Sequence, residues 1–160
     1  MMRRLIAWLA TVLVMALCAW LVYPFFLPAS AKVSRVQARI FDRAAHHDWQ
    51  KVEAMVSAKY LDAAGMKKEE AIQTAKELLE PFITLGFEWT NETVVVEGSK
   101  ATVTGTLRMR GTGPVGSSAI TDRVNKTEKP WVFVWQRDDF DRSDWKLMSA
   151  SNAEIENLKE

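Results

Sequence analysis

Three aspartates near the C-terminus come closest to the spacing of a metal site. Asp139, Asp141 and Asp144 lie in one acidic segment, and carboxylate oxygens spaced in this way could gather a hard cation such as Ca²⁺. An EF-hand loop beginning at Asp139 would need Gly at its sixth position and Glu at its twelfth, where this chain has Asp144 and Ala150. We therefore predict a solvated turn and no metal site; these three aspartates are the residues that would form one.

The histidines and the glycine-rich segment do not complete a site either. His46 and His47 are adjacent, so on a helix their side chains diverge by about 100°. The single cysteine, Cys18, lies in an apolar stretch where it cannot complete a zinc set with them. Residues 111–116, GTGPVG, have the spacing of a dinucleotide fingerprint, but they contain a proline and lack the parallel βαβ context. We therefore predict no cofactor.

Aromatic side chains favour an apolar binding pocket. The chain has seven Trp and seven Phe, and large aromatic residues line most small-molecule pockets. The same residues could instead simply fill the core, and the sequence leaves that alternative open. The candidates for the pocket wall are Phe41, Tyr60, Phe87, Trp89 and Trp135.

Length and charge restrict the classes of function. The chain has 160 residues, of which 48% are hydrophobic, enough for one domain with a core of its own. Its formal charge is +1, with 21 basic and 20 acidic residues. Nucleic-acid-binding domains concentrate positive charge, so this balance gives no reason to expect nucleic acid as a partner.

The N-terminal residues are typical of a membrane anchor. Residues 5–27 carry no charge and are long enough to cross a bilayer as a helix. Two arginines in residues 1–4 predict a cytoplasmic N-terminus and a domain outside the cytoplasm, periplasmic or extracellular. Residues 28–32 are expected to be a linker. They contain Ala-Ser-Ala, so a signal peptide cleaved after Ala31, giving a secreted protein, is the alternative.

Periodicity predicts three helices followed by a sheet. Apolar residues recur every three to four positions over residues 33–44, 49–60 and 67–80, as on the buried face of a helix. Asp48 can cap the second helix, and a proline ends the third. Residues 111–129 are rich in Gly, Ser and polar side chains, and we expect a long polar loop, either a lid or a crossover.

The sheet is expected to be built from two antiparallel hairpins. Residues 87–96 and 101–109 alternate apolar and polar side chains around a Gly-Ser turn, with a kink expected at Asn91. Residues 131–137 and 145–151 flank the acidic turn. Apolar side chains occupy both faces of residues 131–137, which are therefore expected to be central in the sheet. The prediction is an α+β domain, three helices packed on a curved antiparallel sheet.

Three segments of this chain resemble the nuclear transport factor 2-like superfamily. They are IFDRAAHHDWQKVEAMVSAKYLD, VVVEGSKATVTGTLRM and the pair FVWQRDD and DWKLMSAS, which are similar to the first two helices, the central hairpin and the final strands of that superfamily. The resemblance covers residues 33–152 and leaves residues 153–160 as a tail. It implies a cone-shaped, cystatin-like fold, and its motifs are hydrophobic patterns rather than catalytic ones.

The catalytic pair of one branch of the superfamily is absent. Members that resemble ketosteroid isomerase place an Asp base after the second helix and a Tyr in the first, and these positions correspond to Ala64 and Ile40 in this chain. Asp62 lies two residues from the position of the base and is the candidate catalytic acid or base. The alternative for Asp62 is a solvated carboxylate at a helix end.

These observations leave two hypotheses for function. The first is a membrane-anchored, non-catalytic module that binds an envelope protein, a second copy of itself or an apolar ligand; the resemblance supplies a precedent in the assembly-factor subunits of type IV secretion machines. The second is an isomerase- or cyclase-like enzyme acting on a hydrophobic small molecule in the pocket. We expect the first, because the acidic residues and histidines are predicted to lie at breaks and turns, where they are solvated, rather than in the pocket.

Overall fold

A computed structural model describes residue 13 and residues 28–137 and 144–156. No helix in this part of the chain is long and apolar enough to cross a membrane. Of the predicted membrane segment, residues 5–27, only Leu13 is described, and the rest lies outside the described residues. Asp139 and Asp141 also lie outside them.

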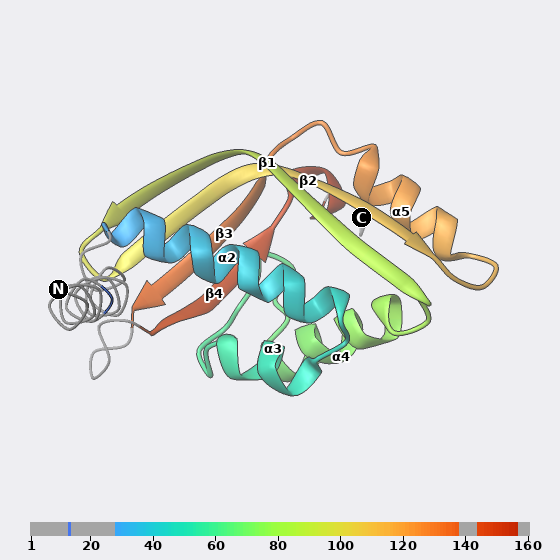
Figure 1. Ribbon diagram of the computed structural model, residues 1–160, viewed down its shortest axis with the longest axis horizontal. Helices are drawn as coiled ribbons and strands as arrows, with labels where there is room; N and C mark the ends of the chain where they lie inside the picture. Colours follow the sequence, from blue (N-terminus) through green and yellow to red (C-terminus); the bar gives the residue numbers. More distant parts are fainter. Residues whose placement is uncertain (1–12, 14–27, 138–143, 157–160) are drawn as a thin grey trace, which may run out of the picture.

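The chain forms helices that pack on one face of an antiparallel sheet (Figure 1). In Figure 1, α2 runs across the sheet, α3 and α4 lie below it, and α5 lies at the right beside the far end of β2. The elements follow in the order α2 (Ala29–Ala45), α3 (Trp49–Met55), α4 (Lys68–Leu79), β1 (Thr84–Glu97), β2 (Lys100–Thr112), α5 (Ser117–Asn125), β3 (Trp131–Arg137), β4 (Trp145–Ser151) and α6 (Ala153–Glu156). The predicted α+β class is confirmed.

The first helix begins earlier than the sequence analysis expected. Pro28 takes the N-cap position of α2, and the first intrahelical bond runs from the backbone N–H of Lys32 to the carbonyl of Pro28. Residues 29–32, expected as a linker, are therefore the first turn of α2. Proline is suited to a helix start, because it lacks the N–H that would have no partner there.

The break between α2 and α3 has a different chemistry from the one predicted. His47 turns the chain with a φ of 55°, and Asp48 takes the N-cap position of α3. The Asp48 side chain makes no cap bond; its Oδ2 lies 2.7 Å from Lys51 Nζ and 3.3 Å from Arg43 Nη1. The predicted capping by the Asp48 carboxylate is thus wrong, because two nearby cations compete for it.

The second helix is shorter than predicted. It ends at Met55, and a turn at Ala58 and Lys59 follows in place of the helix. On either side of this turn the backbone N–H groups of Ser57 and Leu61 donate to the carbonyls of Leu147 and Met148 at 2.9 and 3.0 Å. The apolar positions in this segment suggested a longer helix, but hydrogen bonding to the free edge of β4 satisfies its backbone instead. This places Tyr60 against the sheet.

The four strands pair in the order β1-β2-β3-β4, all antiparallel, so β3 is an inner strand as predicted. The kink predicted at Asn91 is confirmed. The register shifts between Thr90 and Thr93, and Asn91 has a φ of 54°. Because the bulge adds a residue to β1, Trp89 before it and Val94 after it can both face the helices.

A glycine in β2, Gly105, leaves room for the Trp89 ring of the neighbouring strand to lie over the backbone of β2. A Cβ on Gly105 would lie 2.5 Å from Cζ2 of Trp89 and 2.9 Å from the carbonyl oxygen of Thr90. The Trp89 indole therefore occupies the space above Gly105 that a side chain would otherwise fill. The indole N–H donates to Glu92 Oε2 at 2.6 Å, which fixes the ring beside the bulge.

The polar loop predicted for residues 111–129 is wrong, because part of it is α5. This helix begins after Gly116, whose φ is 108°, and it packs on β2. At its end Asn125 Oδ1 accepts from the backbone N–H of Met109 at 2.8 Å, and Asn125 Nδ2 donates to the Met109 carbonyl at 2.9 Å. This pair of bonds ties α5 to β2 beyond Gly105, where the pairing of β2 with β3 ends.

A buried hydrogen bond joins α2 to β3 within the core. The side chains of Trp135 and Gln37 are both 0% exposed, and the indole N–H of Trp135 donates to Gln37 Oε1 at 2.8 Å. This hydrogen bond joins residues 98 positions apart in the sequence. Around it lie Val33, Val103 and Trp145, also buried.

Candidate ligand-binding site

A cavity of about 320 Å³ lies between the helices and the sheet, and we call it the inner cavity. Every side chain that lines it is aliphatic or aromatic. Its wall is made by Ile40, Phe41, Ala44, Trp49, Val52, Val56, Tyr60, Ala71, Ile72, Ala75, Leu78, Leu79, Phe87, Leu107, Met109, Ile120, Val124, Trp131, Phe133, Leu147 and Ala150. Among these lining residues Tyr60 is the only one with a titratable group, so the inner cavity can hold apolar matter with little means of proton transfer.

Three of the predicted pocket residues come together on one side of the inner cavity. The Phe41 ring lies 5.6 Å from the Phe87 ring and 5.5 Å from the Trp89 ring, and Phe133 joins the same aromatic group. Phe41 and Phe87 line the inner cavity, whereas Trp89 packs behind them over Gly105. Edge and tilted contacts of this kind hold the rings in fixed positions.

The other two predicted pocket residues lie apart from this aromatic group. Tyr60 lines the inner cavity, and its side chain is 7% exposed. Trp135 is not part of the wall: it is buried between β3 and α2, where Gln37 accepts its indole hydrogen bond. Trp131, on the same face of β3, lines the cavity instead.

The hydroxyl of Tyr60 is held in its neutral form. Burial raises the pKa of Tyr60 to about 12, the nearby charge of Asp62 acts in the same direction, and a hydrogen bond with the backbone of Ala150 partly offsets them. A tyrosine with such a pKa remains a hydrogen-bond donor at any physiological pH.

A second hollow of about 460 Å³, the outer hollow, adjoins the inner cavity and contains Asp62. The half-buried Asp62 accepts the backbone N–H of Met66 on Oδ1 at 2.8 Å, within a turn. Asp62 does not line the inner cavity. It is thus near Tyr60 but outside the apolar space in which a general base would have to act.

The described residues offer no metal site. No group of three or more His, Cys, Asp or Glu among them could hold an ion. Asp144, the described member of the three aspartates, pairs with Lys146 Nζ at 2.8 Å. His46 and His47 have separate backbone partners: His46 Nδ1 lies 2.7 Å from the Asp42 carbonyl, and His47 Nε2 lies 3.0 Å from that of Leu79.

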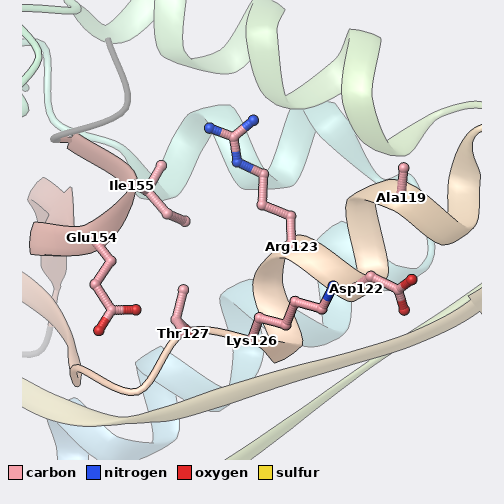
Figure 2. A pocket seen from close by; sticks show the side chains of 7 residues that line it. All are labelled: Ala119, Asp122, Arg123, Lys126, Thr127, Glu154 and Ile155. Carbon is pink, nitrogen blue, oxygen red and sulfur yellow. The ribbon is translucent and has the colours of Figure 1, made fainter. Parts of the chain in front are cut away.

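Figure 2 shows a third hollow, of about 490 Å³, between α5 and α6. In this view the Arg123 guanidinium and the Glu154 carboxylate point in different directions. The Glu154 carboxylate accepts the backbone N–H groups of Glu128 and Lys129 at 3.0 Å each, so it fastens the segment before β3. Asp122 and Lys126 also line this hollow, and such a mixed lining favours no single ligand class.

Two lining residues were missed by the sequence analysis because α5 was expected to be a loop. Ile120 and Val124 line the inner cavity from α5. Their i, i+4 spacing is the signal that could have revealed both the helix and its buried face.

The sequence matches no family model and no curated protein. Similarity appears in comparisons with solved structures. An NTF2-like protein from Cytophaga hutchinsonii has 12% sequence identity and a TM-score of 0.57, over 78% of this chain and 97% of that one. A candidate dehydratase of the NTF2-like family from Streptomyces avermitilis has 16% identity and a TM-score of 0.57, over 75% and 91%.

A third similar structure is larger than this chain. Bd1075 from Bdellovibrio bacteriovorus has 10% identity and a TM-score of 0.57 over 74% of this chain, which spans only 38% of Bd1075. Identities this low establish a shared fold and no shared activity. The chain therefore has the nuclear transport factor 2-like α+β fold, with helices packed on an open four-stranded antiparallel sheet.

Proposed function

We propose that this protein is a non-catalytic binding module that holds an apolar small molecule in the inner cavity. The observation that carries the proposal is the composition of the wall, in which the neutral Tyr60 is the one titratable lining residue described. Catalysis by proton transfer requires an acid or base in the site together with a group that sets its protonation state. An apolar wall instead favours retention of a ligand.

The size of the inner cavity supports the same function. Small-molecule sites have volumes of about 300 to 1,000 Å³, and the inner cavity, at about 320 Å³, is at the lower end of that range. On the helices the wall includes three alanines, Ala44, Ala71 and Ala75. Small residues from the helices leave room that larger ones would close.

Binding of a neutral fluorophore tests this proposal. N-phenyl-1-naphthylamine should bind the full chain saturably, with increased emission. Ala75→Phe places a ring in the cavity wall and should abolish the saturable signal, whereas Ala54→Phe, on the exposed face of α3, should keep it. If both variants bind the fluorophore as the unmodified chain does, the inner cavity is not the binding site.

The second candidate is an enzyme acting on a hydrophobic small molecule. Tyr60 as a proton donor and Asp62 in the adjoining hollow favour it, and the candidate dehydratase from Streptomyces avermitilis is a structural neighbour. Organic extraction of the purified protein discriminates between the two functions. The extracted molecule is then incubated with fresh protein. A binding module should leave it unchanged, whereas an enzyme should convert it. In the second case Asp62→Asn should stop the conversion.

We also propose that residues 5–27 anchor the module in a membrane, with residues 1–4 in the cytoplasm and the domain outside it. Confinement near the membrane would raise its effective concentration for an envelope protein or for a second copy of the chain. Protease added to intact spheroplasts should digest the domain. N-terminal sequencing that begins at Lys32 would show cleavage after Ala31 and would overturn retention of the anchor.

A further inference from the structure

The inner cavity and the outer hollow lie side by side. Six residues line both of them, and we call these residues the shared wall: Tyr60, Ala71, Ala75, Leu78, Trp131 and Ala150. The polar residues that the outer hollow adds are Asp62, Thr74, Ser151 and Asn152. A molecule that extends beyond the inner cavity would therefore pass from an apolar space into a polar one.

Asp62 brings an uncompensated negative charge to the outer hollow. It is the single charged side chain among the described residues that line this hollow, and it is half-buried. None of the described Lys, Arg and His side chains forms an ion pair with it. Lys67 and Lys68, which follow soon after Asp62 in the sequence, do not line the hollow. A ligand that carries a positive charge would supply the counter-charge that the described lining lacks.

The position of this charge is fixed, and its effect reaches the shared wall. Asp62 Oδ1 accepts the backbone N–H of Met66 at 2.8 Å, and the backbone of Asp62 is bonded to Met66 and Gly65 in the same turn. Burial and, second to it, the charge of Asp62 raise the pKa of Tyr60. Because Asp62 disfavours a negative charge at the Tyr60 hydroxyl, it favours a positive one there. This effect acts through space and needs no direct bond between the ligand and the carboxylate.

The neutral polar side chains of the outer hollow add little to this selection. Asn152 Nδ2 donates to the Lys129 carbonyl at 2.9 Å, and Asn152 Oδ1 accepts from the backbone N–H of Glu154 at 3.0 Å. The hydroxyl of Thr74 lies 3.9 Å from the sulfur of Met66. Charge therefore distinguishes ligands in this hollow more strongly than neutral hydrogen bonding does.

We propose that the ligand is a cationic amphiphile, with its apolar body in the inner cavity and a protonated amine in the outer hollow near Asp62. This inference rests on the proposed function and adds to it the chemical class of the ligand. Anionic amphiphiles such as fatty-acid carboxylates are disfavoured by the same arrangement, because their head group would be repelled by Asp62.

Matched naphthalenes test the inference on the full chain in an uncharged detergent, by displacement of N-phenyl-1-naphthylamine. The probes have nearly the same shape: 2-(2-aminoethyl)naphthalene is a cation at neutral pH, 2-(2-hydroxyethyl)naphthalene is neutral, and 2-naphthylacetate is an anion. Each affinity is measured on the unmodified chain and on Asp62→Asn, which removes the charge and keeps an oxygen for the Met66 N–H. Glu97→Gln is the matched control, because Glu97 is an exposed acid at the end of β1 that lines neither hollow. Comparing one probe on two proteins cancels its partitioning into detergent.

The amine should lose about two- to fivefold in affinity on Asp62→Asn, the range of one partly exposed ion pair. The anion should bind more tightly to this variant, and the alcohol should change little. Glu97→Gln should change none of the three affinities. Ala44→Phe, at a position that lines the inner cavity and not the outer hollow, should weaken all three probes alike.

The failure of the inference and the failure of the proposed function give different results. If Asp62→Asn changes the affinities of the amine and the alcohol equally, or if the anion binds the unmodified chain best, the inference is wrong while the proposed function stands. If the fluorophore itself does not bind saturably, the proposed function fails.

Salt dependence on the unmodified chain covers the case in which Asp62→Asn does not fold. The ratio of the amine affinity to the alcohol affinity should fall as the ionic strength rises from about 0.02 M to about 0.5 M, because salt screens the charge of Asp62. A ratio that does not change with salt would show that no protein charge acts on the amine and would overturn the inference.

Discussion

The buried hydrogen bond between Trp135 and Gln37 should contribute measurably to stability. Both side chains are 0% exposed, and the bond joins α2 to an inner strand. Trp135→Ala should lower the free energy of unfolding by about 3 to 5 kcal/mol, because it removes a whole buried ring system. Trp135→Phe should lower it by roughly 2 to 4 kcal/mol, since it leaves a smaller void but also leaves Gln37 Oε1 without a donor.

Replacing the acceptor, Gln37, should lower the free energy of unfolding by less than replacing the donor. Gln37→Met leaves the Trp135 N–H unpaired, but it also removes Gln37 Nε2, which is buried and has no acceptor among the described residues. These two effects oppose each other, so we expect a loss of about 1 kcal/mol or less. The double variant combines Trp135→Phe with Gln37→Met, so it leaves neither an unpaired donor nor an unpaired acceptor. Its loss of unfolding free energy should therefore be smaller than the sum of the two single losses by about 1 kcal/mol.

Urea denaturation of the full chain, followed by far-ultraviolet circular dichroism, measures this coupling without relying on tryptophan emission. A coupling energy within about 0.3 kcal/mol of zero would show that the bond adds nothing beyond packing. A loss below about 1 kcal/mol for Trp135→Ala would contradict the burial of the ring itself.

Two further predictions concern the sheet and Tyr60. Gly105→Ala should destabilise the fold by about 1 to 3 kcal/mol, because its Cβ would collide with Trp89, whereas Gly86→Ala, with no atom within 4 Å of the new Cβ, should be neutral or slightly stabilising in the same urea assay. In a Tyr23→Phe chain, ultraviolet absorbance should titrate Tyr60 with a pKa of about 12; a midpoint near 10 would contradict its burial. Since its pKa is raised on folding, stability should fall as the pH rises from about 10 to 12, by about 2 kcal/mol more than in Tyr60→Phe.

The sequence predicted the sheet well because the alternation of side chains follows directly from strand geometry. Apolar residues occupy odd positions up to Trp89 and even positions from Val94, and a strand can keep both on one face only by adding a residue between them. The bulge beside Asn91 could therefore be located before its geometry was known.

The helices were predicted less accurately because tertiary contacts decide their ends. The apolar residues Val56 and Tyr60 have helical spacing, but hydrogen bonds to β4 and a turn at Ala58 and Lys59 replace the helix there. Glycines before α5 and serines in its first turn disguised a helix that is stabilised by packing on β2. Local sequence records propensity, and it does not record which strand edge is free to bind.

The candidate site shows the same limit. Alternation places Trp131 and Trp135 on one face of β3, so the sequence could not distinguish a core residue from a cavity wall. The distinction comes from α2, which presents Gln37 to Trp135, whereas Trp131 lies beside small residues of α4. A contact between segments so far apart in sequence has no local signature.

The two bonds between Asn125 and Met109 have a consequence for solubility. β2 continues to Thr112, beyond the end of its pairing with β3, and such an unpaired strand edge can recruit a strand from another molecule. Asn125 presents an acceptor and a donor to Met109 as a neighbouring strand would, but it does so from a helix, which offers no new edge for further growth. In Asn125→Ala the backbone of Met109 would be open to other chains. The helix α5 thus also protects the protein against aggregation through its own sheet.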